Sequence, residues 1–232
     1  MKRFKDILCM AEPGKECKPA LERAVTLAEN NQANLTVITL APSISVGIGM
    51  PEGGPISTDL QATIVSSHKQ ELENLVEPYR QRIKIETRVL IGTPFLEIIR
   101  EVLRNAHDLV IKCPESLDWL GSLFSSDDKH LLRKCPCPVW LVRPQTGELF
   151  DRILAAVDVD DSYPSKELKT RQALNEMVTE LASSLAVSEF AELHVVHAWE
   201  VIGESKLRHS PFVQRPESEV IAYVDQARRH YA

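Results

Sequence analysis

The stretch that decides the fold runs from residue 83 to residue 103, IKIETRVLIGTPFLEIIREVL, and it changes its period partway. Its first part, Ile83–Leu90, is short and rich in β-branched residues, which predicts a strand. After Gly92, Thr93 can cap the free N–H groups of a helix, and Pro94 suits the first helical position. Apolar residues with helical spacing then predict a helix with one buried face: Phe95, Ile98, Ile99, Val102 and Leu103. A strand that turns directly into such a helix is the repeating unit of α/β folds.

The same alternation continues on both sides of this stretch. Short apolar runs rich in β-branched residues predict four more strands, at residues 7–11, 35–40, 109–111 and 139–142. Helical spacing predicts helices near residues 20–31 and 60–79. Buried strands joined through helices pair in parallel by right-handed crossovers. We therefore predict that residues 1–145 form one complete α/β domain, an open, five-stranded, doubly wound, Rossmann-like parallel sheet with helices on both faces.

Two segments of this first domain carry local predictions. A fourth helix is expected to begin near Ser125, because Ser125 and Asp128 have the spacing of a capping box. Helix chemistry alone would then explain the acids at the start of this helix. The segment 41–58 holds four of the nine glycines and is expected to be a mobile loop at the ligand end of the sheet, beyond the carboxyl ends of the strands.

A second unit is expected from residue 146, because its start repeats the start of the first. Phe150–Asp158 matches Phe4–Glu12 with phenylalanine, isoleucine and leucine in register. A helix, a strand and another helix are predicted at residues 165–185, 193–198 and 216–231. We expect residues 146–232 to be the N-terminal half of a second domain, with two of five strands. Its small sheet would leave apolar side chains exposed: Val157, Val195, Val196, Ile221 and Val224.

Composition and charge exclude several classes of protein. The 232 residues are 44% hydrophobic and 26% charged, as in ordinary folded proteins. The net charge is −6 and the basic residues are scattered, so no nucleic-acid partner is expected. No apolar run approaches the roughly 20 residues that a membrane span needs, and no export signal is recognisable, so we expect a cytoplasmic protein without membrane contact.

Enzyme and metal motifs are missing from the sequence. It contains no G-x-S-x-G elbow, H-E-x-x-H pair, kinase set or phosphate loop, and its histidines lack ligand spacing. We expect neither catalytic residues nor a metal site, and hence no enzyme. The five cysteines are an odd number and are expected to be reduced. Cys135-Pro136-Cys137 has too few ligands for zinc, and a redox pair usually has two intervening residues, so these thiols are expected to be structural.

Four stretches carry a resemblance to a known family. They are Ile7-Leu8, Gly92-Thr93-Pro94 with Ile98, Asp108 to Ile111, and the run HLLRKCPCPV from His130 to Val139. With them the chain resembles the universal stress protein family, and more narrowly its tandem, E-type members. The resemblance implies an adenine nucleotide alpha hydrolase-like sheet and a stress-response role, and the last run is the most specific.

The resemblance also marks a nucleotide site whose residues depart from the family pattern. Members that bind ATP place three glycines around the phosphates, because bare backbone lets N–H groups approach phosphate oxygens. Those positions fall here on Lys112, Glu115 and Ser125, followed by Ser126. Asp158, which Glu12 matches in the first domain, stands where nucleotide-binding members often place an aspartate near the adenine. We therefore expect no ATP binding in the first domain and no cofactor in this chain, with ATP conceivable in a longer parent.

Three functions remain open at this stage. The leading hypothesis is a non-enzymatic binding or signalling protein that acts through a small ligand or a protein partner. The alternative is an ATP-binding, slowly hydrolysing member whose site lies in a complete second domain. A redox-sensing role through Cys113, Cys135 and Cys137 is the third. Because family domains pair through the fifth-strand edge, the resemblance also predicts a homodimer through Pro138, Val139, Trp140, Leu141 and Val142.

Overall fold

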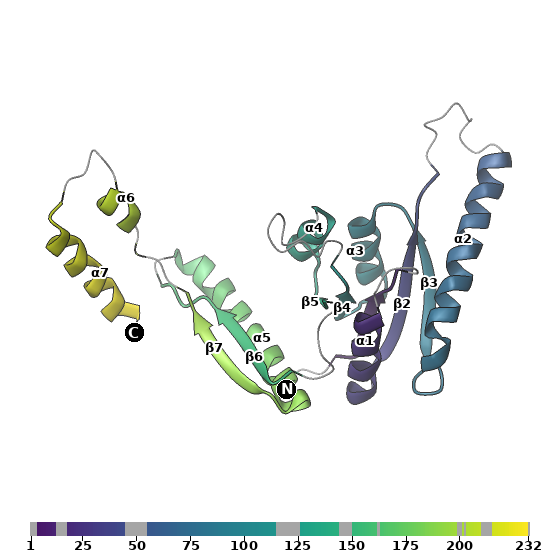
Figure 1. Cartoon of the computed structure of the whole chain (residues 1–232), viewed down its shortest axis with the longest axis horizontal. Coiled ribbons are helices and arrows are strands. Elements are labelled where there is room, and N and C mark those ends of the chain that lie inside the picture. The colour runs from purple at the N-terminus through teal and green to yellow at the C-terminus, as the bar shows by residue number, and fades with distance from the viewer. Residues whose placement is uncertain are drawn as a thin grey trace. The chain divides into compact units, whose positions relative to one another are not determined.

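The computed structural model describes residues 4–12, 18–44, 55–114, 126–143, 150–161, 163–198, 201, 203–209 and 215–231. The chain divides into two compact units, with the boundary between residues 149 and 150. Each unit is described by itself (Figure 1). Whether the second unit is the first half of another domain of the same kind stays a prediction.

The first unit is built on one parallel sheet. Its strands are β1 (Asp6–Met10), β2 (Asn34–Ala41), β3 (Ile85–Ile91), β4 (Leu109–Lys112) and β5 (Val139–Leu141). They lie in the order β3-β2-β1-β4-β5, and every neighbouring pair is parallel. The predicted open five-stranded α/β sheet is confirmed. Strand β1 lies at its centre and is buried over its last four residues, as an apolar run without polar alternation requires.

Helices cover both faces of this sheet. They are α1 (Lys18–Asn31), α2 (Pro55–Val76, followed by the 3₁₀ turn Glu77–Tyr79), α3 (Pro94–Asn105) and α4 (Ser126–Lys134). On one face, Leu8 and Met10 pack in a core with residues of α3 and α4. On the other, Cys9 Sγ lies 3.9 Å from the carbonyl oxygen of Ala20 in α1. Helix α2 packs against β2 and β3 (Figure 1).

Two local predictions need correction. Thr93 holds the N-cap position of α3 and Pro94 follows it, but the Thr93 side chain makes no capping hydrogen bond. The segment expected to be a loop over 41–58 is shorter, because α2 already begins at Pro55. Proline is favoured in the first turn of a helix, where its missing N–H group costs nothing. The glycines of that segment lie outside the described residues.

The second unit contains a two-stranded parallel sheet. Strand β6 (Arg152–Val157) pairs with β7 (Glu192–His197), and helix α5 (Ser165–Glu189) packs against both. Helices α6 (Glu204–His209) and α7 (Glu217–Tyr231) follow, of which α6 was not predicted. Val195, Val196 and Ile221 are exposed, at 55%, 39% and 46% of their surface. These three side chains expose apolar surface as predicted, whereas Val157 and Val224 are only partly exposed.

Candidate functional site

The carboxyl ends of β1 and β4 meet at one edge of the sheet, where the degenerate nucleotide positions were predicted. Lys112 is the last residue of β4 and lies opposite Met10 of β1. Glu12, two residues after Met10, is partly exposed. Ser126 is the first residue of α4. Glu115 and Ser125 lie outside the described residues. Asp158 belongs to the second unit and is described with that unit below.

A buried ion pair between Lys112 and Asp128 lies at this edge of the sheet. Lys112 is 2% exposed and Asp128, in the first turn of α4, is fully buried. The Lys112 Nζ atom lies 2.6 Å from Asp128 Oδ1. Met10, the register partner of Lys112, packs on the face covered by α3 and α4, so Lys112 points toward α4 from the same face. The pair therefore joins the last residue of β4 to the first turn of α4.

The pair changes the electrostatics of the helix start. Free N–H groups and the helix dipole make the first turn of a helix attractive to an anion such as phosphate. Here the chain supplies that anion itself, because the carboxylate of Asp128 lies in the first turn and neutralises Lys112. The expectation that helix chemistry alone explains Asp128 is therefore wrong. The partner of Asp128 lies 16 residues away, beyond the reach of local pattern arguments.

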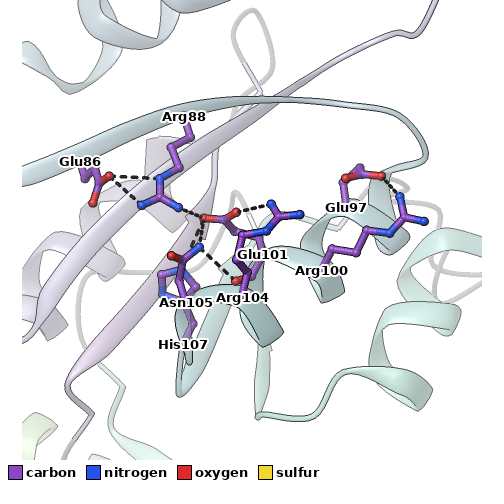
Figure 2. Close-up of polar contacts among 8 residues, drawn as sticks. All are labelled: Glu86, Arg88, Glu97, Arg100, Glu101, Arg104, Asn105 and His107. Carbon is purple, nitrogen blue, oxygen red and sulfur yellow. Dashed lines mark hydrogen bonds and ion pairs between the residues drawn. The ribbon is translucent and has the colours of Figure 1, made fainter.

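A second polar cluster surrounds Glu101 of α3, which is 1% exposed. Figure 2 shows side chains of β3 and α3 converging on its carboxylate. Arg88 Nη1 lies 2.5 Å and Asn105 Nδ2 2.9 Å from Oε1. Arg104 Nη1 lies 3.8 Å from Oε2, and His107 Nε2 lies 3.8 Å from Oε1. A buried carboxylate is tolerable only with such partners, because burial strips it of water.

Arg88 connects this cluster to the edge strand β3. Its Nη2 atom lies 2.7 Å from Oε1 of Glu86 on the same strand. The hydrogen bond to Glu86 and the nearby charge of Glu101 raise the pKa of Arg88 above its ordinary value, so the guanidinium stays charged. A cavity of about 410 Å³ lies beside the cluster and is lined by α2, β3 and α3. The cluster was missed from the sequence, although Glu101 stands next to Val102 on the apolar stripe of the predicted helix.

In the second unit, Asp158 is fixed at the end of β6 by two side chains of α5. Its backbone N–H donates to Asn175 Oδ1 (3.0 Å), and Asn175 Nδ2 donates to its carbonyl oxygen (2.6 Å). Arg171 donates to the Asp158 carboxylate and also pairs with Glu167, at 2.8 Å. The guanidinium lies 3.6 Å from the ring centroid of Tyr163. Arg171 and Asn175 were not predicted from the sequence, and a nucleotide role for Asp158 stays a prediction.

The edge predicted to pair with a second copy lies within the described residues. Strand β5 has β4 as its neighbour on one side, and no strand of the described residues pairs with its other side. The three strand residues are partly exposed. Arg23 of α1 lies over the Trp140 ring, 5.7 Å from its centroid, which orders this side chain. Pairing of two copies here stays a prediction.

Comparison with known proteins settles the family. The model of the Universal stress protein family matches residues 3–143. The chain therefore belongs to the universal stress protein family, as predicted.

Its curated relatives bear the name of the predicted E-type subgroup. "Universal stress protein E" of Photorhabdus laumondii is 31% identical over 209 residues, which cover 87% of this chain and 64% of the relative. The protein of that name from Escherichia coli K12 is 29% identical over 205 residues, with 87% and 63% covered. The chain thus spans less than two thirds of the length of these relatives.

Solved structures share the fold. A protein described as a universal stress protein from Pseudomonas aeruginosa UCBPP-PA14 superposes with a TM-score of 0.64 at 22% identity, covering 98% of this chain and 70% of that one. The universal stress protein UspA of Lactobacillus plantarum gives a TM-score of 0.53 at 18% identity, covering 62% of this chain and all of that one.

In the part of the chain that the structure describes, no helix has the length and apolar character to cross a membrane.

The buried pair at the sheet edge makes a prediction about stability. Lys112→Met and Asp128→Asn should each lower the free energy of unfolding by about 3–5 kcal/mol, because each strands one buried charge. The double variant should cost at least about 1 kcal/mol less than the sum of the two, since no charge is then stranded. Urea titration followed by tryptophan fluorescence measures all three. Asp127→Asn, on the same helix turn, is the control and should cost less than about 1 kcal/mol. Additive costs would contradict the coupling.

The cluster around Glu101 makes a second prediction about stability. Glu101→Gln should lower the free energy of unfolding by about 1.5–3 kcal/mol, because charge-assisted hydrogen bonds from Arg88 and Asn105 are weakened in a buried site. Glu97→Gln is a matched control on the same helix. Glu97 pairs with Arg100, which is 60% exposed, so its loss should change the free energy by less than about 1 kcal/mol. Equal effects of the two substitutions would show that burial of Glu101 carries no special cost.

Proposed function

We propose that this chain is a non-enzymatic universal stress protein whose first unit does not bind ATP and which acts by binding a protein partner or a small ligand other than ATP. The buried ion pair between Lys112 and Asp128 is the observation that carries the proposal. It lies where the family resemblance implies a glycine-lined phosphate site.

Three physical effects disfavour the binding of a triphosphate at this edge. The Lys112 side chain stands where the backbone would have to be bare for phosphate oxygens to approach N–H groups. Its charge is already neutralised at 2.6 Å, so a phosphate must displace Asp128 from a buried partner. The carboxylates of Asp128 and of Glu12 near the same edge also repel an anion, and the repulsion is strongest where water is excluded.

The described polar clusters support a non-enzymatic role. Glu101 is held by Arg88 and Asn105, and Asp158 by Arg171, so these carboxylates are neutralised structural groups. A general acid or base needs a proton-transfer partner within reach and a pKa near neutral pH. The clusters built around these two carboxylates join helices to strands, which favours a protein that acts through its surface.

Self-association through β5 belongs to the same proposal. The N–H group of Val142 donates to Lys112 of β4, at 2.9 Å. Because successive N–H groups of a strand point to opposite sides, that of Leu141 points away from β4, toward the side where no strand of the described residues pairs with β5. Two copies that pair there would form one continuous sheet and cover part of the partly exposed Trp140 and Leu141.

Calorimetric titration with Mg-ATP tests the nucleotide part of the proposal. The intact chain should give no saturable binding with a Kd below about 100 µM, and Mg-ATP should leave its Tm unchanged. Asp128→Asn removes the competing carboxylate charge and should gain weak binding of ATP or inorganic phosphate. Asp127→Asn keeps the pair and should bind neither. Tight binding by the unmodified chain would favour the alternative, an ATP-binding universal stress protein.

Light scattering after size exclusion tests the dimer. At tens of micromolar the chain should have twice the monomer mass of 26.1 kDa. Leu141→Pro removes the outward N–H group and should give a monomer with unchanged circular dichroism. Leu141→Ala keeps that group and should remain a dimer. A monomeric unmodified chain would refute pairing through β5.

A further inference from the structure

Two thiols meet in the turn between α4 and β5. Cys135 follows the last residue of α4, and Cys137 precedes β5 by two residues. Their Sγ atoms lie 3.7 Å apart, and both are free thiols. The two sulfurs are thus in contact, although a single proline separates the residues.

The surroundings hold the two thiols in place and leave them accessible. Both side chains pack against the core that α3 and α4 form on the sheet, yet both residues are partly exposed. The N–H group of Cys135 donates to the carbonyl oxygen of Leu131, at 2.9 Å. Pro136 restricts the backbone between the cysteines, because its ring fixes φ. Little conformational freedom remains to be lost when the sulfurs approach each other.

The contact differentiates the two sulfurs chemically. The hydrogen bond from the Cys137 thiol lowers the pKa of Cys135 to about 7. The same bond, burial and the nearby Cys135 and Asp108 charges raise the pKa of Cys137 above its ordinary value. The lowered pKa favours the thiolate of Cys135, which is the reactive form of a cysteine. Cys137 remains a protonated thiol beside it.

We propose that Cys135 and Cys137 form a redox-active dithiol that hydroperoxides oxidise to an intrachain disulfide. This revises the expectation that both are merely structural thiols, since the spacing of two cysteines in sequence matters less than the distance between their sulfurs. Cys113 is not needed for the reaction, which narrows the redox hypothesis made from the sequence. The proposal is independent of whether the first unit binds ATP.

The reaction balances with one hydroperoxide as the oxidant. The Cys135 thiolate attacks one peroxide oxygen, the O–O bond breaks, and the leaving hydroxide or alkoxide takes up a proton. Cys135 is then a sulfenic acid. Cys137 loses its proton and attacks the Cys135 sulfur, the S–O bond breaks, and the hydroxide leaves as water. The sulfurs give up two electrons in total, and a small dithiol, or two equivalents of a small thiol, can return them by thiol–disulfide exchange, leaving as the oxidised disulfide.

Peptide mass spectrometry tests the proposal directly on the full chain. Trypsin cleaves after Lys134 and not at Arg143, which precedes proline, so both cysteines fall in one peptide ending at Arg152. After a few equivalents of hydrogen peroxide and alkylation of the remaining thiols, this peptide should be unalkylated and lighter by two hydrogen atoms. Dithiothreitol should restore both thiols. A peptide that stays fully alkylated would overturn the proposal, as would disulfides that link two chains in its place.

Single substitutions assign the roles. Cys137→Ser should stop the reaction at the Cys135 sulfenic acid, which dimedone traps. Cys135→Ser should react with peroxide at least about tenfold more slowly, because no thiolate of low pKa remains. Cys137→Ala should move the pH midpoint of Cys135 alkylation upward from about 7, since the hydrogen bond that lowers this pKa is lost. The buried Cys9 is the internal control for accessibility. Equal rates at Cys9 and Cys135, or an unmoved midpoint in Cys137→Ala, would contradict these roles.

Discussion

Burial of the central strand on both faces is the constraint on which the first unit depends. The side chains of the last four residues of β1 alternate between the α3–α4 face and the α1 face, and almost none of their surface reaches water. A strand buried in this way needs hydrogen-bonded neighbours on both edges and helices on both sides. Strands β2 and β4 are the hydrogen-bonded neighbours of β1 on its two sides. The right-handed crossovers that connect parallel strands place helices on both faces of the sheet. The carboxyl ends of β1 and β4, and the start of α4, are thereby brought to one place.

Apolar covering on this scale decides what charged residues can do inside it. Lys112 at the end of β4 and Glu101 on α3 both lie within the covered faces, where an unpaired charge would cost several kcal/mol. Each is met by an opposite charge from another element, Asp128 in one case and Arg88 in the other. Because both charged residues are buried in the faces that stabilise the fold, each forms an ion pair that joins two elements of secondary structure. Of the two pairs, Lys112–Asp128 lies at the carboxyl end of β4, where the family resemblance implies a phosphate site.

The turn between α4 and β5 combines two further consequences of the packing. Cys135 and Cys137 pack against the core on the α3–α4 face, and their sulfur atoms are in contact. The short strand β5 follows, and one of its edges has no partner strand among the described residues. Thiol chemistry and self-association are thus proposed for adjacent parts of one connection. The carboxyl ends of β1 and β4 lie at the opposite edge of the sheet from this turn, because β5 runs parallel to β4.

Much of this molecule could be predicted from the sequence alone. The run from Ile83 to Leu103 changes from strand to helix spacing, and the same alternation along the chain predicted the order of elements and the parallel sheet. These are properties of neighbouring residues, because periodicity and capping act over a few positions. The family followed from short motifs such as HLLRKCPCPV, and the missing glycines were also visible there.

Only the tertiary structure decided which residues became partners. Asp128 had the spacing of a helix cap, and its partner Lys112 comes from a strand 16 residues earlier. Thr93 had the right type and place for a cap, yet its side chain makes no such bond. Arg88 and Glu101 meet across a turn, and Cys135 and Cys137 meet because both pack against the core on either side of Pro136. Pair interactions depend on distances of a few ångströms between separate segments, and those distances exist only once the core has closed.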